Sequence, residues 1–543
     1  MIKRREFLRT SAIGIGGYAL ARLIGTSVVA QSRSVDSSIE VLIDEPLGTI
    51  SPHIYGHFTE DLGGVIYDGV WVSENSNIPN ISGIRTSLVD HLRAIKAPVI
   101  RFPGGCFADS YDWRDGIGPR DKRPRRTNFG GGSDSNQFGT NEFVQFCKLV
   151  GAEPYLAANV RSLPPQQFVQ WVEYCNSPAG STTLAEMRAA AGSKEPFNVK
   201  YWGVGNESWG CGGNFEPAQY AMEFRRYATW VPRYSQKLAF VASGPSDYNY
   251  DWTSGFFEAM AKQNPHFSAP WGWALHFYAW NLSRGRTSDW DKGKGDAVNF
   301  DATDWYELLR EGQNMEMLIE RHWQVMGQID HEHRVKLVVD EWGPWYQPGS
   351  EATPGFTLQQ MSTLRDALFS GMTLDIFNRH PEKVAMANCA QLINCLNSLY
   401  LAHEDKFVVT PVGRVFELYA AHQGGQAVRT IFNAPKVQYD RDGKPATFWG
   451  LQGSASLHDK KLVVTAVNPN VSQPRETEIT VRGAKPLSAT MTVLISSDIH
   501  AHNTFVEPHA VMLRSGEVKI TSSGVVAMIP AASVVCLQVN LLG

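Results

Sequence analysis

The stretch "VKYWGVGNESWGCGG" (residues 199–213) contains a short apolar run that ends in an amide and a carboxylate, Asn206 and Glu207. The residues just before Asn206 are apolar one after another and do not alternate with polar residues, which is typical of a strand covered on both faces. The glycines after Glu207 favour a loop. The stretch therefore predicts a buried strand whose carboxyl end presents an acidic side chain.

Eight apolar runs of this kind recur between about residues 50 and 395, separated by stretches long enough for a helix. The runs span residues 50–58, 98–104, 153–159, 199–207, 238–245, 272–280, 335–342 and 384–392. An apolar stripe at helical spacing marks four of the separating stretches, 87–95, 141–150, 218–231 and 358–372. Eight alternations of strand and helix favour an α/β fold of the (β/α)8 TIM barrel type.

The sequence changes character after about residue 430. Short runs such as "KLVVTAVNP" and "SVVCLQVNL" are rich in β-branched residues, end at Gly, Pro or Asn, and show no helical pattern. They predict a C-terminal antiparallel β-sandwich. We therefore expect four parts: an export signal in 1–30, an N-terminal strand segment that pairs with the sandwich in 31–49, a catalytic barrel in 50–430, and the sandwich in 431–543.

The N-terminus has the pattern of a targeting segment. Paired arginines in "KRREFL" (3–8) precede a short apolar run, and "SVVA" ends at Ala30 with small residues suited to cleavage. This pattern predicts a twin-arginine export signal and a periplasmic or extracellular location, with an ordinary secretory signal or a retained amphipathic start as alternatives. The run is too short for a membrane span, Arg22 interrupts its continuation, and no later segment is long enough.

Composition and cysteine usage narrow the class of protein. The chain of 543 residues has a net charge of −4, which gives no electrostatic reason to expect nucleic acid or a membrane surface as partner. Its seven cysteines are scattered and contain no CxxC pair, so neither a disulfide scaffold nor a structural zinc site is expected. Cys106 and Cys211 fall in loops on the predicted active face, and whether they are bridged stays open.

Two glutamates follow apolar runs on different strands. In a (β/α)8 barrel the carboxyl ends of the strands build the active site, so Glu207 and Glu341 are expected to meet at the barrel mouth. Two carboxylates that flank a glycosidic bond suit hydrolysis, one as general acid and the other as nucleophile. The alternative is that each glutamate pairs with a structural arginine or caps a helix. The pair on two expected strands favours the catalytic interpretation, with Glu207 as acid and Glu341 as nucleophile.

Other strand ends contribute polar side chains. His276 and Tyr278 are two residues apart and therefore lie on the same side of an extended strand. From there Tyr278 is placed to donate a hydrogen bond to Glu341. Arg101 is expected to pair with a core carboxylate, and Asn206 to bind a substrate hydroxyl or a neighbouring loop.

Seven motifs carry a resemblance to a known family: "ISPHIYGHFTEDLGGVIYDGVW", "IRFPGGCFADSYDWRDGIGPRDKRP", "FGTNEF", "YWGVGNESWGCGG", "HFYAW", "VVDEWGPWY" and "ANCAQLIN". In this order they resemble the α-L-arabinofuranosidases of glycoside hydrolase family 51. The resemblance implies a retaining exo-hydrolase that removes terminal α-L-arabinofuranosyl groups from arabinan or arabinoxylan fragments, needs no cofactor and assembles into hexamers. It assigns Glu207 as acid/base and Glu341 as nucleophile. It also assigns sugar contacts to Glu60, Cys106, Asn206, His276, Tyr278 and Gln391.

Two other functions are compatible with the same residues. A related barrel hydrolase acting on xylosides or β-glucans would use the same carboxylates, because loop-built subsites decide which sugar is bound. A non-catalytic carbohydrate-binding protein on a barrel scaffold is the alternative from a different class. The presence of both acids argues against it.

Overall fold

The computed structural model describes residues 35–263, 269–282, 287–522 and 524–542. The predicted export signal in residues 1–30 lies outside this part of the chain. From Val35 onward the chain forms one compact unit. Among the described helices, none combines the length and the apolar character needed to cross a bilayer.

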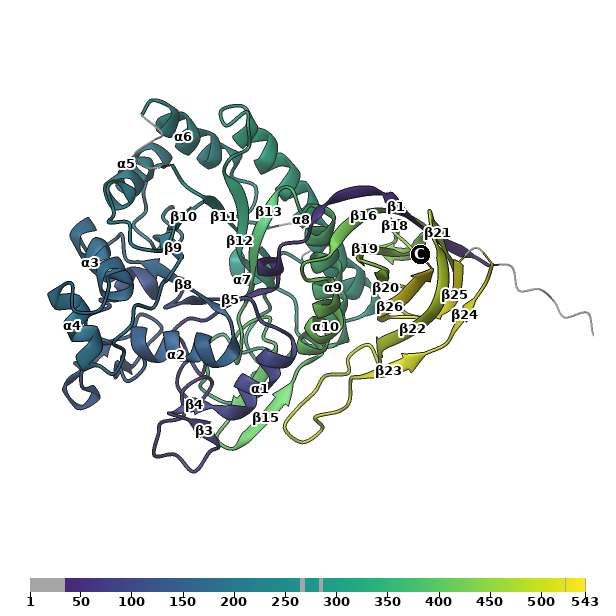
Figure 1. Cartoon of the computed structure of the whole chain (residues 1–543). Coiled ribbons are helices and arrows are strands. Elements are labelled where there is room, and N and C mark those ends of the chain that lie inside the picture. The colour runs from purple at the N-terminus through teal and green to yellow at the C-terminus, as the bar shows by residue number, and fades with distance from the viewer. Residues whose placement is uncertain (1–34, 264–268, 283–286, 523, 543) are drawn as a thin grey trace, which may run out of the picture. The chain divides into compact units, whose positions relative to one another are not determined.

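Eight parallel strands close into a barrel in the order β10-β11-β12-β13-β2-β5-β8-β9 (Figure 1). Their bounds are β2 Gly56–Phe58, β5 Val99–Phe102, β8 Glu153–Ala158, β9 Tyr201–Val204, β10 Ala239–Ala242, β11 Gly272–Ala279, β12 Lys336–Pro344 and β13 Val384–Ala390. Seven of these strands fall within predicted apolar runs, and β12 begins in the run 335–342 and continues two residues beyond it. The predicted TIM barrel is confirmed.

Helices connect the strands and cover the barrel. They are α1 Thr86–Ala94, α2 Thr140–Val150, α3 Pro165–Asn176, α4 Thr183–Ala190, α5 Pro217–Ala228, α6 Tyr250–Ala261, α7 Trp290–Gly293, α8 Ala302–Gly327, α9 Leu364–Arg379 and α10 Pro411–Tyr419. Four 3-10 turns lie at η1 Pro52–Tyr55, η2 Ala108–Ser110, η3 Arg120–Lys122 and η4 Ala420–His422.

Two predicted boundaries are wrong for local reasons. The helix predicted from residue 358 begins only at Leu364, because Thr363 accepts from the backbone N–H of Arg365 and Asp366 completes a capping box. The run predicted as strand from residue 50 begins with the turn η1, where Pro52 occupies the first helical turn, and only Gly56–Phe58 pairs in the barrel.

The C-terminal strands form a ten-stranded sheet in the order β23-β22-β26-β20-β19-β16-β1-β21-β25-β24. Their bounds are β1 Ser37–Thr49, β16 Gln426–Asn433, β19 Gln452–His458, β20 Lys461–Asn468, β21 Arg475–Arg482, β22 Lys485–Ile495, β23 Met512–Gly516, β24 Val518–Ile520, β25 Gly524–Ile529 and β26 Ser533–Leu542. The strand β22 also contacts β24 from the other end of the order, so the sheet curls around its own apolar core. The predicted antiparallel domain is confirmed, with one exception: β1 pairs with β21 in parallel.

The other strands of the described residues form four two-stranded ribbons. They are β3 Asn80–Ile81 with β4 Ile84–Arg85, β6 Arg126–Thr127 with β7 Ser133–Asp134, β14 Tyr400–His403 with β15 Lys406–Val409, and β17 Val437–Arg441 with β18 Lys444–Phe448.

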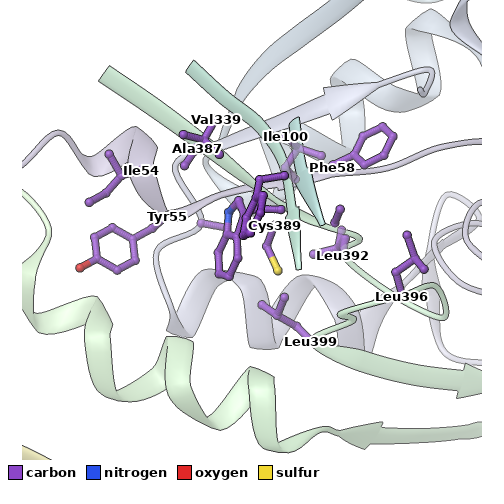
Figure 2. Close-up of a cluster of buried hydrophobic side chains, with 14 of the residues drawn as sticks. Ile54, Tyr55, Phe58, Ile100, Val339, Ala387, Cys389, Leu392, Leu396 and Leu399 are labelled. Carbon is purple, nitrogen blue, oxygen red and sulfur yellow. The ribbon is translucent and has the colours of Figure 1, made fainter. Parts of the chain in front are cut away.

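An apolar cluster packs strand ends of the barrel against the segment that follows β13 (Figure 2). Phe58, Ile100 and Cys389 belong to neighbouring strands, and Leu392 and Leu399 follow β13. All five are buried. Close packing of this kind fixes backbone positions, so the polar residues at these strand ends are held on a rigid frame.

A buried carboxylate ties the barrel to the C-terminal sheet. Asp375 on α9 accepts hydrogen bonds from Ser454 Oγ at 2.6 Å, Thr465 Oγ1 at 2.6 Å and Tyr419 Oη at 2.8 Å. Burial raises the pKa of Asp375 to about 6, although the three hydroxyls oppose the shift. The side chain therefore satisfies three buried donors from both parts of the fold.

We expect Asp375→Ala to lower the free energy of unfolding by roughly 2–4 kcal/mol, because three buried hydroxyls lose an acceptor. The folded state binds the Asp375 proton more tightly than the unfolded state, so this contribution is fully present below about pH 4 and is lost as pH rises through about 6. The difference between variant and wild type should therefore be larger at pH 4 than at pH 7 in urea titrations. Asp90→Ala, an exposed position on α1, is the matched control and should change stability little. An equal loss in both variants would contradict the assignment.

Candidate active site

Glu207 and Glu341 meet at the mouth of the barrel. An oxygen of each carboxylate and a ring nitrogen of His276 all lie within 4.8 Å of one another. His276 lies between the two acids, with Nδ1 at 3.0 Å from Glu207 Oε1 and 3.5 Å from Glu341 Oε2. Retaining glycosidases have carboxyl groups about 5–5.5 Å apart, whereas inverting enzymes need about 6.5–9.5 Å. The spacing therefore suits the retaining reaction.

A tight turn after β9 presents Glu207. Gly205 and Glu207 both have a positive φ, 84° and 39°. A positive φ is strained for a residue with a side chain and is often found at functional sites. A Cβ on Gly212 would lie 1.7 Å from the carbonyl oxygen of Asn206, so only glycine allows the loop to fold back this closely.

A register shift in β12 brings two adjacent acids to the barrel interior. Val339 pairs with Leu275 and Glu341 pairs with His276, so Asp340 is an extra residue opposite β11. Adjacent strand residues normally point to opposite faces, and a bulge changes this direction. As a result Asp340 and Glu341 are both buried and both contact Arg101.

The buried guanidinium of Arg101 contacts Asn206, Asp340 and Glu341 at the base of the cavity. Its Nη1 donates to Glu341 Oε1 at 2.8 Å and its Nη2 donates to Asn206 Oδ1 at 2.5 Å. Its Nε lies 3.6 Å from Asp340 Oδ2. Burial would lower the pKa of Arg101, but Asp340 and Glu341 outweigh it and raise the pKa. Arg101 thus pairs with a core carboxylate as predicted, and one of its partners is Glu341.

The surroundings favour the ionised form of Glu341. Burial alone would raise the pKa of this carboxyl, but His276, Arg101 and a 2.7 Å hydrogen bond from Tyr278 Oη outweigh it, and the pKa lies below its ordinary value. For His276 burial would lower the pKa, while Glu341 and Glu207 raise it, and the net shift is upward. The ionised form of Glu341 and the protonated form of His276 therefore favour each other.

A cavity of about 220 Å³ lies above these groups, smaller than the roughly 300–1,000 Å³ usual for drug-sized ligands. Predicted site residues that line it are Glu60, Cys106, Asn206, Glu207, Tyr278, Glu341 and Gln391. His276 does not line the cavity, and its ring contacts Glu207 and Glu341. Residues not predicted for the site also line it, among them Leu62, Phe129, Thr357 and Leu358. They are apolar or loop residues without a recognisable sequence signal. A larger hollow beside Trp71 is lined by neither Glu207 nor Glu341.

Glu60 and Gln391 form a polar pair on the cavity wall. Gln391 Nε2 donates to Glu60 Oε2 at 3.3 Å, and the N–H of Phe107 donates to Glu60 Oε1 at 2.9 Å. Burial, followed by the charge of Glu341, raises the pKa of Glu60 to about 7. Near neutral pH this carboxyl therefore both accepts and donates, which suits recognition of a sugar hydroxyl.

Asp109 and a disulfide hold the Glu207 loop. Asp109 accepts from the backbone N–H groups of Val160 and Asn206 at 2.8 and 3.0 Å. Cys106 and Cys211 are bridged, which settles the pairing that the sequence left open. Trp342, which follows Glu341 in the sequence, is fully buried in the core, whereas Trp345 lines the cavity.

Two groups of side chains among the described residues have the spacing of metal ligands. One is Cys106, Glu207 and Cys211, and the other is Glu207, His276 and Glu341. Both include Glu207.

Comparison with known proteins gives two family models and a close relative. A model described as "Alpha-L-arabinofuranosidase 1 domain" matches residues 91–294, and "Alpha-L-arabinofuranosidase C-terminal domain" matches 340–533. An intracellular exo-α-L-arabinofuranosidase from Bacteroides ovatus is 35% identical over 526 residues, which is 95% of this chain and 99% of the relative.

This relative corrects the predicted location. It aligns with nearly the whole chain and is named an intracellular enzyme, which contradicts the expected periplasmic or extracellular protein. The paired arginines that motivated the expectation lie outside the described residues. An arginine pair before a short, weakly apolar run is a generic pattern, and it does not by itself specify export.

Solved structures agree with the family. The GH51 arabinofuranosidase from Xanthomonas axonopodis pv. citri matches with a TM-score of 0.86 and 37% identity over 93% of this chain and 100% of that one. An α-L-arabinofuranosidase from Thermotoga maritima, solved as an arabinose complex, matches with a TM-score of 0.80 and 28% identity over the same shares. The chain therefore belongs to the α-L-arabinofuranosidases of glycoside hydrolase family 51.

Proposed function

We propose that this protein is a retaining, exo-acting α-L-arabinofuranosidase that releases terminal α-L-arabinofuranosyl groups from arabinan or arabinoxylan fragments. One observation carries the proposal. Glu207 and Glu341, at the ends of the fourth and seventh barrel strands, each place a carboxylate oxygen within 4.8 Å of the other. Membership of the family gives the sugar, and the spacing supports double displacement.

In the first step Glu341 attacks the anomeric carbon and Glu207 protonates the leaving oxygen. Arg101 and Tyr278 donate to separate oxygens of Glu341, which keeps the carboxylate ionised and oriented. A covalent arabinosyl-enzyme results. In the second step Glu207, now ionised, removes a proton from water, and the water releases the sugar with retained configuration.

The remaining predicted residues bind the terminal sugar. Glu60, Gln391 and Asn206 offer hydrogen-bonding groups around the cavity, and Cys106 supplies part of its wall. A cavity of about 220 Å³ leaves room for little more than one ring, which supports exo action. His276 serves as a positioning residue that bonds Glu207 and faces Glu341.

We further propose a division of labour along the chain. Residues 50–430 form the catalytic unit, and residues 431–543 form a supporting β-domain with β1, the strand in the predicted 31–49 segment, although β16 already begins at Gln426. The family resemblance supports a homo-hexamer, and light scattering on the purified protein measures the subunit number.

Substrate screening tests the proposed function. Purified protein should hydrolyse 4-nitrophenyl α-L-arabinofuranoside and leave the corresponding β-xyloside and β-glucoside intact, because the cavity of about 220 Å³ suits one furanose ring. Release of 4-nitrophenol measures turnover. Preferential xyloside or glucoside turnover would favour a related barrel hydrolase, and no turnover with any of them would favour the binding protein.

Glu207→Ala tests the acid/base role. Hydrolysis of natural oligosaccharides should fall about 10²–10⁴-fold, since general acid catalysis is lost, while aryl substrates with good leaving groups still arabinosylate Glu341. Added azide should then restore turnover and give an arabinosyl azide of retained configuration, identified by NMR. In Glu341→Ala azide should give no retained product. Glu258→Gln, an exposed glutamate on α6, is the matched control with wild-type activity. A Glu207→Ala variant with wild-type rates on oligosaccharides would refute the assignment.

Tyr278→Phe tests the electrostatic environment of the nucleophile. The Tyr278 hydroxyl stabilises the ionised form of Glu341, so its removal raises the pKa of Glu341 and leaves more of the nucleophile protonated in acid. The acid limb of kcat/KM should move to higher pH, and kcat should fall about 10–100-fold. Tyr250→Phe, outside the cavity, is the control. An unchanged acid limb in Tyr278→Phe would show that this hydrogen bond does not set the pKa.

A further inference from the structure

The disulfide between Cys106 and Cys211 lies directly against the proposed acid/base residue. Cys106 follows β5 and Cys211 follows β9, and their sulfurs lie 3.8 and 3.6 Å from Glu207 Oε2. Both cysteines are half-buried, and Cys106 lines the cavity. Neither sulfur has a role in the two displacement steps, so the contact calls for an explanation of its own.

Reduction of this disulfide would leave two thiol sulfurs and one carboxylate oxygen close enough together to bind a single metal ion. The two sulfurs and a Glu207 oxygen lie within 4.8 Å of one another. A tetrahedral zinc site with bonds of about 2.3 Å to sulfur and about 2.0 Å to oxygen has sulfur–oxygen edges of about 3.5 Å. The observed distances of 3.6 and 3.8 Å are already close to these edges. Only the two sulfurs need to separate, and the 5.6 Å between the Cα atoms leaves room for that.

We propose that, in the reduced protein, Cys106, Cys211 and Glu207 form a binding site for a thiophilic divalent cation such as Zn²⁺ or Cd²⁺, and that the bound ion stops catalysis. Two thiolates and a carboxylate are ligands that these ions prefer, with water from the cavity as the fourth. His276 stays bonded to the other oxygen of Glu207 and orients the carboxylate. The loss of turnover, though not the binding itself, rests on the proposed function.

The chemistry involves two balanced steps. A dithiol reduces the disulfide: its two sulfurs transfer two electrons and two protons, each cysteine becomes a thiol, and the reductant closes to a cyclic disulfide. The cation then binds both sulfurs and releases the two thiol protons. Glu207 coordinates the ion as carboxylate and therefore carries no proton for the leaving oxygen.

The other cysteines do not offer this arrangement. Cys147, Cys175, Cys389, Cys395 and Cys536 are free and buried. Among the described residues, none of these five belongs to a group of three or more side chains with the spacing of metal ligands. Ion binding that depends on reduction is therefore expected at Cys106 and Cys211.

Metal titration of reduced and oxidised protein tests the proposal. The full-length protein is reduced with a dithiol, freed of reductant by anaerobic gel filtration and titrated with Cd²⁺. We expect one ion per chain by elemental analysis, a thiolate-to-metal absorption band in the ultraviolet, and at least a tenfold loss of arabinofuranoside hydrolysis that a chelator reverses. The oxidised protein should bind no ion. Absence of binding to the reduced protein, or equal binding to both forms, would overturn the proposal.

Variants assign the ligands. Cys211→Ala should show neither the absorption band nor stoichiometric Cd²⁺ after reduction, whereas Cys536→Ala, a buried cysteine in the C-terminal sheet, should bind as the wild type does. Equal binding by Cys211→Ala would refute the site. If Cys211→Ala does not fold, the difference in Cd²⁺ binding between oxidised and reduced wild-type protein still tests the proposed site. Stoichiometric binding by a protein without arabinofuranosidase activity would support the site and refute the proposed function.

Discussion

The buried contact between Arg101 and the two acids of β12 is the constraint on which the active site depends. A guanidinium with about 1% exposure needs compensating charge, and Asp340 and Glu341 supply it. Both acids reach the guanidinium because the register shift at Asp340 turns consecutive side chains to one side. Asp340 is itself fixed by hydrogen bonds of 2.8 Å from Tyr155 and Asn388. Glu341, the proposed nucleophile, is thus oriented by the strands of the barrel rather than by a loop.

This contact also explains how several carboxyl groups share one small cavity. Glu341 lies near Arg101 and His276 and keeps a lowered pKa, whereas Glu60 has a pKa of about 7 because burial and the charge of Glu341 both oppose its ionisation. The cavity therefore does not hold a full negative charge on every acid near neutral pH. Environment, and not residue type, divides the roles among chemically similar side chains.

Local signals made most of the fold predictable. Buried parallel strands have uninterrupted apolar runs, and so all eight barrel strands and the strands that present Glu207 and Glu341 were apparent in the sequence. The register shift at Asp340 is not apparent in the sequence, because it depends on pairing with β11 and β13 rather than on local composition. The parallel pairing of β1 with β21 joins residues more than 430 positions apart, and no periodicity reports such a contact. The start of α9 was misplaced because the cap at Thr363 outweighed an apolar stripe that extends further back.

Glu207 and Glu341 are supported in different ways, and the difference fits the roles proposed for them. Glu341 lies within β12 with 7% of its side chain exposed, whereas Glu207 follows β9 on a loop with 20% exposed. A nucleophile must stay ionised and fixed relative to one carbon atom, which a barrel strand provides. An acid/base residue must give a proton to a leaving group and later take one from water, which requires access to the cavity. Asp109, the close approach of Gly212 to Asn206, and the disulfide restrict the loop without burying its carboxylate. The loop thus keeps Glu207 within reach of His276 while leaving its carboxylate open to the cavity, as the proposed acid/base role requires.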